Sequence, residues 1–284
     1  MTAAWLAPRR TVLAAVVAAT LAACGKDERM ESTSRPTGGD AGTTYGDDPS
    51  QYGELRLPDG TPRGVVVVIH GGFWKAQYDL SYGTPLAVDL AERGWVTWNL
   101  EYRRVGSGAG GGGGVPATLD DIATGIDHLA AMAAAGLLPE ESLQRVVALG
   151  HSAGGHLATW AAWREAPAVP VTHVVSQAGV LDLVAGSRDG LGGGAVDAFL
   201  GHPPTAADAA ADPTQQLPLA APVWCVHAPD DDIVPFSQSE DYVRRATEAG
   251  ATATLVEVIG GHFGVIETDH PAWSRIRDIF DTLP

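Results

Sequence analysis

The sequence is poor in cysteine and in basic residues, and both shortages narrow the class of protein. Only two cysteines, Cys24 and Cys225, occur among 284 residues, so a fold held by a framework of disulfides is excluded. Lysine and arginine total 18 against 34 acidic residues, a net charge of −16. The basic residues form no cluster that would neutralise a row of phosphates, so we expect no nucleic-acid partner.

Apolar runs long enough to span a bilayer are also missing. The run from Val12 to Ala23 has only about a dozen residues and follows Arg9-Arg10, as in an export signal. It ends in Leu21-Ala22-Ala23-Cys24-Gly25, which resembles a bacterial lipoprotein box. This resemblance implies a signal peptide over residues 1–23, a lipid on Cys24 and a protein held at the cell surface or in the periplasm.

Two alternatives stay open for this N-terminal segment. Pro8 to Leu13 also resembles a twin-arginine signal, so export by the Sec or the twin-arginine route is undecided. An ordinary secretory signal that leaves Cys24 as a free thiol is the alternative to a lipid anchor. Residues 24–50 are polar and lack apolar periodicity, which predicts a flexible tether before a catalytic domain at residues 51–284.

The domain alternates short apolar runs with helical patterns. The runs are mostly β-branched and apolar throughout, as in strands covered on both faces. The alternation predicts an α/β fold with a mainly parallel sheet and helices on both sides. We expect strands at 64–69, 96–102, 145–149, 172–176, 223–227 and 254–259, and helices at 82–93, 118–135, 154–164, 237–249 and 271–283.

Two glycine-rich stretches, 106–114 and 186–194, interrupt this alternation. Neither has a strand before it and a helix after it at the spacing of a phosphate-binding turn, so we expect loops and no nucleotide cofactor. Histidines, cysteines and carboxylates do not cluster at ligand spacing, so we expect no metal site. Cys225, in an apolar run, is expected to pack in the core.

The strongest chemical motif is Gly150-His151-Ser152-Ala153-Gly154, between an expected strand and an expected helix. This strand-turn-helix context is that of a nucleophile elbow, where a sharp turn exposes the serine and tolerates only small neighbours. The pattern is weak by itself because the chain contains 35 glycines. The interpretation of Ser152 as a nucleophile therefore depends on the motifs before and after this pattern.

An upstream strand ends in His70-Gly71-Gly72-Phe73. Small residues there let backbone N–H groups approach a developing oxyanion, together with the N–H of Ala153. Gly71, Gly72, Phe73 and Ala153 are therefore the candidate oxyanion hole. Phe73, Trp74 and Tyr78 are candidates for a substrate pocket, with packing beneath the turn as the alternative.

A serine needs an imidazole to take its proton and a carboxylate to orient that imidazole. His262 follows the last expected strand in a glycine-flanked turn, which favours it as the base over His151, His156 and His270. His70 and His227 are expected to brace loops through hydrogen bonds. Asp230, Asp231 and Asp232 follow another strand end, and Asp182 is a further candidate for the acid.

These ordered blocks resemble the α/β-hydrolase esterases of the His-Gly-Gly-x-Trp type, which are similar to kynurenine formamidase and small bacterial carboxylesterases. The blocks are His70 to Trp74, Asn99 to Arg104, Gly150 to Ala158, Asp231 to Pro235 and Gly261 to Phe263. The resemblance implies Ser152 as nucleophile, His262 as base and Asp231, three residues before Val234, as acid. His227-Ala228 stands where that family usually has His-Gly.

We therefore expect an enzyme that cleaves small-molecule carboxylic esters, without a cofactor. An arylformamidase or other amidase is one alternative, since the same residues cleave activated amides. A surface-binding lipoprotein without catalysis is an alternative of another class. The stretch from Gly186 to Leu217 is expected to form a short cap over the site or an excursion without contact to substrate.

Overall fold

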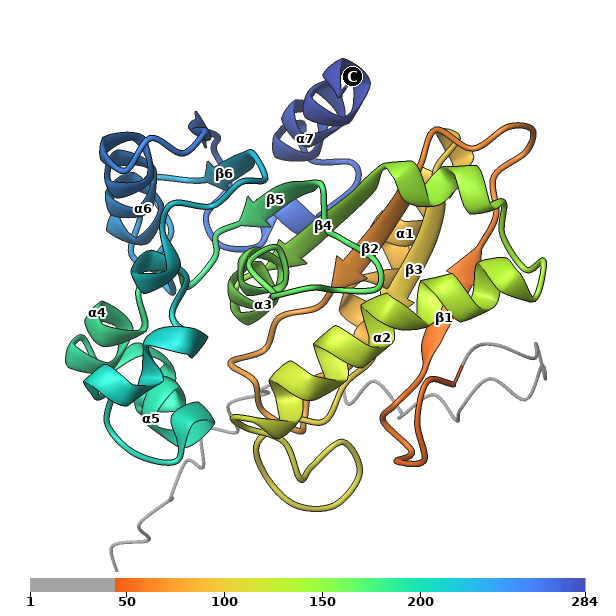
Figure 1. Cartoon of the computed structure of the whole chain (residues 1–284). Coiled ribbons are helices and arrows are strands. Elements are labelled where there is room, and N and C mark those ends of the chain that lie inside the picture. Colours follow the sequence, from red (N-terminus) through yellow and green to blue (C-terminus); the bar gives the residue numbers. More distant parts are fainter. Residues whose placement is uncertain (1–43, 284) are drawn as a thin grey trace, which may run out of the picture. The chain divides into compact units, whose positions relative to one another are not determined.

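A computed structural model describes residues 44–283, which form a seven-stranded sheet between helices (Figure 1). The strand order is β1-β3-β2-β4-β5-β6-β7, and only β1 runs antiparallel to its neighbour. The carboxyl ends of the six parallel strands therefore meet at one edge, where such sheets bind ligands. The strands are β1 Gly53–Arg56, β2 Val65–Ile69, β3 Val96–Leu100, β4 Val146–His151, β5 His173–Gln177, β6 Val223–His227 and β7 Ala253–Glu257.

The apolar strand β2 shows why the sheet needs helices on both faces. Alternate side chains of a strand point to opposite sides. Val65, Val67 and Ile69 join one buried apolar cluster, whereas Val66 and Val68 join a second. Both clusters exclude water, which is the main driving force for this layered arrangement.

The helices divide between these two clusters. Helices α2 (Ala117–Ala134), α3 (Ala153–Ala161) and α6 (Ser237–Glu248) pack in the cluster that contains Val67. Helices α1 (Thr84–Glu92) and α7 (Pro271–Thr282) pack in the cluster that contains Val66. The α/β fold expected from the alternating pattern is thus confirmed.

All the strands and helices expected from the sequence are present, with ends that differ by a few residues. The sequence did not indicate β1, which is short and half-buried. The expectation of a plain loop over 186–194 was wrong, because Gly186 lies inside helix α4 (Leu183–Arg188). The Asp182 side chain caps this helix by accepting a hydrogen bond from the Ala185 N–H.

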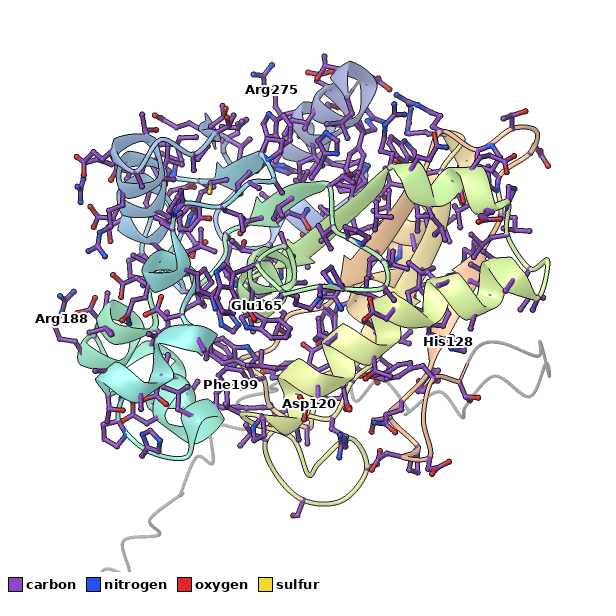
Figure 2. The ribbon with its side chains drawn as sticks, in the orientation of Figure 1. Asp120, His128, Glu165, Arg188, Phe199 and Arg275 are labelled. Atoms are coloured by element: carbon purple, nitrogen blue, oxygen red, sulfur yellow. The ribbon has the colours of Figure 1, made fainter. Side chains whose placement is uncertain are left out.

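The cap segment, residues 183–217, lies between β5 and β6 and contains α4, α5 (Ala195–Leu200) and short 3₁₀ turns. Phe199, labelled in Figure 2, lies on the side of α5 that faces the rest of the domain and is fully buried. The cap segment thus contributes to the main core.

The domain begins earlier than residue 51. Tyr45 is buried, and its hydroxyl donates to the carbonyl oxygen of Glu101 at 2.6 Å. Residues 44–50, expected in the tether, therefore pack on the domain. The expected signal segment, Cys24 and the rest of the tether lie outside the described residues. Among residues 44–283, no helix has the length and apolar character needed to cross a membrane.

Candidate active site

The candidate site lies at the carboxyl edge of the sheet. Gly71 to Phe73 follow β2, and Ser152 follows β4 directly. Asp231 follows β6, and His262 follows β7. The fold thus brings together side chains that are far apart in the sequence, as expected for loops at this edge.

Ser152 stands in a strained turn between β4 and α3, with φ 55° and ψ −118°. A non-glycine residue in this region costs about 1–3 kcal/mol. The flanking glycines make the turn possible. A Cβ on Gly150 would lie 2.0 Å from the Gly154 carbonyl oxygen, and one on Gly154 would lie 2.1 Å from that of Ile69.

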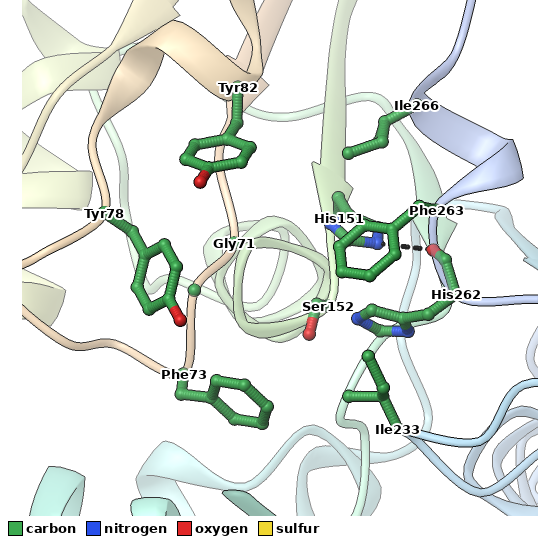
Figure 3. Close-up of a pocket in the computed structure, with 11 residues that line it drawn as sticks. Gly71, Phe73, Tyr78, Tyr82, His151, Ser152, Ile233, His262, Phe263 and Ile266 are labelled. Carbon is green, nitrogen blue, oxygen red and sulfur yellow. Dashed lines mark hydrogen bonds between the residues drawn. The ribbon is translucent and has the colours of Figure 1, made fainter. Parts of the chain in front are cut away.

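His262 and Asp231 form a close pair. The Nδ1 of His262 lies 2.7 Å from Oδ2 of Asp231, and both side chains are almost fully buried. Figure 3 shows the Ser152 hydroxyl and the His262 ring facing one another in the cavity that both line. The unpaired edge of the imidazole is therefore turned toward the serine.

The surroundings of Asp231 keep it ionised. Burial by itself would raise its pKa, but hydrogen bonds from His227, from His262 and from the Val234 N–H outweigh burial and lower the pKa below its ordinary value. Asp230 and Asp232 are exposed. Asp182 is a helix cap whose carboxylate lies 3.3 Å from Arg245.

His227 braces the loop that carries Asp231. Its Nε2 lies 3.1 Å from both the Asp231 Oδ2 and the Val234 carbonyl oxygen. Both partners are acceptors, so this nitrogen must carry a proton. His227 therefore donates to the same carboxylate oxygen that accepts from His262.

The three other histidines considered as bases use a ring nitrogen in hydrogen bonds to the backbone. His151 contacts the His262 carbonyl oxygen through Nε2 at 2.9 Å, and burial and the nearby His262 lower its pKa to about 3. His156 contacts the Ala211 carbonyl oxygen at 2.8 Å. His270 caps α7 by accepting from the Ala272 N–H.

His70, which was expected to brace a loop, contacts the Gly71 carbonyl oxygen at 2.8 Å and thus braces the turn after β2.

The turn after β2 supplies the candidate oxyanion donors. Gly72, Phe73 and Trp74 have positive φ angles of 108°, 55° and 54°. The N–H groups of Phe73 and Ala153 donate to no other group among the described residues. The N–H of Ala153 is free because it belongs to the first turn of α3. These donors are available to an oxygen near Ser152.

Ser152 opens into a cavity with about 410 Å³ of empty space, part of it open to solvent (Figure 3). Tyr78, one of the expected pocket residues, lines it, as does Phe73. Trp74 does not. Its ring is fully buried and stacks on Phe199 with centroids 4.6 Å apart, so the alternative of core packing holds for Trp74.

Four lining residues were not singled out in the sequence. They are Tyr82, Ile233, Phe263 and Ile266, which come from three separate segments. Phe263 directly follows His262, and this neighbourhood was the one feature of the sequence that could have indicated a pocket residue. The others are single apolar or aromatic residues, which only tertiary contacts assign to a pocket.

The described residues contain no group of three or more histidine, cysteine or acidic side chains placed to hold a metal ion. Ser152, the His262–Asp231 pair and the backbone donors lie together at the carboxyl edge of the sheet. With the mainly parallel sheet, these features define a protein of the α/β-hydrolase fold.

The model of the BD-FAE family matches residues 55–245, and the chain belongs to that family. The match includes Ser152 and Asp231 and ends before His262. No curated protein matches the sequence.

Solved structures with this fold include several esterases. A truncated carbohydrate esterase from gut microbiota is 19% identical, with a TM-score of 0.70 over 84% of this chain and 93% of that one. A thermophilic esterase of the Planctomycetes species Thermogutta terrifontis is 23% identical, with a TM-score of 0.66 over 84% and 89%. An acetyl ester-xyloside bifunctional hydrolase from Caldicellulosiruptor lactoaceticus is 18% identical, with a TM-score of 0.64 over 81% and 87%.

Proposed function

We propose that this protein is a serine hydrolase that cleaves carboxylic esters through Ser152, His262 and Asp231. The observation that carries the proposal is the 2.7 Å contact between His262 and Asp231 beside the strained Ser152. A buried, ionised carboxylate fixes the imidazole tautomer and stabilises the imidazolium that forms when the base takes a proton. The structural similarity to esterases supports the same conclusion.

The reaction follows from the positions of these groups. The Ser152 oxygen attacks the ester carbonyl carbon while Nε2 of His262 accepts the hydroxyl proton. The N–H groups of Phe73 and Ala153, with Gly72 beside them, stabilise the oxyanion. His262 then returns the proton to the leaving alcohol, and an acyl group remains on Ser152.

Hydrolysis of the acyl-enzyme completes the cycle. A water molecule attacks the acyl carbon, and His262 accepts one of its protons. The same proton then passes to Ser152 as the acid leaves. His262 thus serves as base and acid in both halves of the reaction.

The size and lining of the cavity favour small or medium acyl groups. Its walls are mainly apolar or aromatic, including Phe73, Ile233 and Ile266. Structures of the Thermogutta terrifontis esterase hold butyrate or propionate, and that esterase is phosphoramylated by tabun. These neighbours support both a short acyl group and a reactive serine.

The decisive test is Ser152→Ala with p-nitrophenyl acetate and butyrate as substrates. We expect activity below about 1% of the wild type, because loss of the nucleophile typically removes several orders of magnitude of rate. The circular dichroism spectrum should stay unchanged. Residual activity above that level in a folded variant would refute Ser152 as the nucleophile.

Two further measurements separate the alternatives. Rates on N-formylkynurenine and on p-nitrophenyl acetate distinguish a formamidase from an esterase. Labelling by a fluorophosphonate probe, lost in Ser152→Ala, distinguishes an enzyme from a binding protein that only keeps the fold. Failure of the wild type to react with the probe or with any ester would favour the binding protein.

We also propose that the protein is exported and anchored by a lipid on Cys24. The support is the apolar run that ends in Leu21-Ala22-Ala23-Cys24. In a bacterial host, Cys24→Ser is expected to abolish incorporation of labelled palmitate and to release the protein from the membrane fraction. An unchanged distribution would refute the anchor.

A further inference from the structure

The cap segment contacts Trp74 and Lys75, the two residues that follow Phe73 in the turn after β2. Trp74 stacks on Phe199 of α5, with ring centroids 4.6 Å apart. The ammonium group of Lys75 donates to the carbonyl oxygen of Gly192 at 3.0 Å. Residues from two separate parts of the cap segment thus fix the chain just after Phe73, which itself supplies a candidate oxyanion donor.

Gly192 lies directly against the Phe73 ring. A Cβ on Gly192 would lie 2.3 Å from Cδ1 and 2.6 Å from Cε1 of that ring. Ordinary side chains never approach so closely, so the ring occupies this position only because residue 192 has no side chain. The φ of Gly192, +60°, is also one that favours glycine.

The Phe73 ring separates Gly192 from the cavity. Phe73 lines the cavity, whereas Gly192 does not. In Figure 3 the ring forms the lower wall of the space in front of Ser152. The width of the cavity therefore depends on how close to Gly192 the ring lies.

Lys75 contacts both the Phe73 ring and Gly192. Its Nζ lies 5.2 Å from the centroid of the Phe73 ring, over the face of the ring, while it binds the Gly192 oxygen. A cation over an aromatic face is attracted to it. The ring is thus held by the backbone of Gly192 and by the ammonium of Lys75.

We propose that Gly192 is a positioning residue that sets the size of the substrate accepted at the Ser152 cavity by letting the Phe73 ring withdraw from it. Lys75 holds the ring and the oxyanion turn in that position. The proposal rests on the proposed ester hydrolysis, because substrate size is measured by turnover. It gives the cap segment a role in specificity although none of its residues lines the cavity.

The test compares Gly192→Ala with Gly193→Ala. Both glycines have positive φ, +60° and +70°, so alanine strains the backbone similarly at both. A Cβ on Gly193 meets no atom within 4 Å, whereas one on Gly192 meets the Phe73 ring. The ring contact is the closest contact that distinguishes the two variants, and the other is a 3.0 Å approach of the Gly192 Cβ to the Cβ of Ala195.

We measure kcat and KM for p-nitrophenyl esters from acetyl to octanoyl and for acetate esters of alcohols of increasing size. The Phe73 ring borders the cavity on the side away from Gly192, so the methyl of Gly192→Ala should push the ring into the cavity. In at least one series, the preference for the smallest substrate should rise roughly tenfold, the effect of one or two methylenes in an apolar pocket. Gly193→Ala should keep the wild-type preference.

Phe73→Ala provides the second comparison, because it removes the ring that Gly192→Ala would displace. The double variant Phe73→Ala/Gly192→Ala should have the same size preference as Phe73→Ala alone. If Gly192→Ala does not fold by itself, this double variant should fold, because it lacks the clash with the ring, which is the closest contact that the new methyl would make. A double variant that does not fold, or that still differs from Phe73→Ala, would overturn the proposal.

The two proposals fail in different ways. A wild-type protein that hydrolyses no ester refutes the proposed function. An active wild type in which Gly192→Ala and Gly193→Ala show the same size preference, or in which Gly192→Ala favours larger substrates, refutes only the role of Gly192.

Discussion

Asp231 differs from its two acidic neighbours in the number of hydrogen bonds it accepts. One carboxylate oxygen accepts from His262 and His227, and the other accepts from the N–H groups of Ile233 and Val234 at 2.9 Å. Four donors satisfy a buried carboxylate that would otherwise be costly to desolvate. The same bonds fix its orientation toward His262.

Asp231→Asn should therefore reduce kcat by about 10³–10⁴-fold, because an amide neither stabilises the imidazolium nor selects the productive tautomer. The matched control is Asp232→Asn, which changes an exposed neighbour and should keep the wild-type rate. Steady-state kinetics on p-nitrophenyl acetate measure both. Similar rates for Asp231→Asn and the wild type would remove Asp231 from the mechanism.

The edge of the sheet at β1 depends on the residues that precede it. Tyr45 donates to the carbonyl oxygen of Glu101, just beyond β3, and the Tyr45 N–H donates to the Gln51 oxygen at 3.0 Å. The side chain of Gln51 in turn donates to Asp121 of α2 at 2.7 Å. The first described residues thus join β3 and α2, which explains why the domain begins before residue 51.

Tyr45→Phe should lower the free energy of unfolding by about 1 kcal/mol, because it removes one buried hydrogen bond and leaves the Glu101 oxygen without that donor. Asp47→Ala, in the same segment and exposed, should change stability little. Urea unfolding followed by tryptophan fluorescence compares them. Equal midpoints for Tyr45→Phe and the wild type would contradict this account of the boundary.

Two buried histidines of the described domain, His151 and His156, make its stability depend on pH. Burial lowers the pKa of His156 to about 4 and, with the nearby His262, that of His151 to about 3. In the unfolded chain both return to about 6.5. As pH falls below about 6.5, these histidines become protonated in the unfolded chain but stay neutral in the folded protein. The free energy of unfolding therefore falls between that pH and the lower pKa of the folded state.

Each of these histidines should therefore cost about 2 kcal/mol of stability between pH 7 and pH 5, at about 1.4 kcal/mol per pH unit below 6.5. His156→Gln removes one titrating group and can still donate to the Ala211 oxygen. Its free energy of unfolding, measured by urea titration, should fall less over this range than that of the wild type. Identical slopes would show that His156 does not titrate on unfolding.

Local patterns in the sequence predicted most of the fold, because the periodicity of strands and helices depends on neighbouring residues. They missed β1, which has only four residues, too few to carry a clear pattern, and they took 186–194 for a loop because of its glycines. The packing of Leu183 and Val196 in the core outweighs the cost of glycine there.

The sequence by itself determined the α/β architecture and the order of the chemical motifs, with Ser152 in an elbow and His262 after the last strand. Only the tertiary structure decided that Asp231 contacts His262, that Tyr82 and Phe263 line the cavity, that Trp74 belongs to the core, and that Gly192 abuts Phe73. The physical reason is that strand and helix patterns are local, whereas these contacts join residues that only the packing of distant segments brings together.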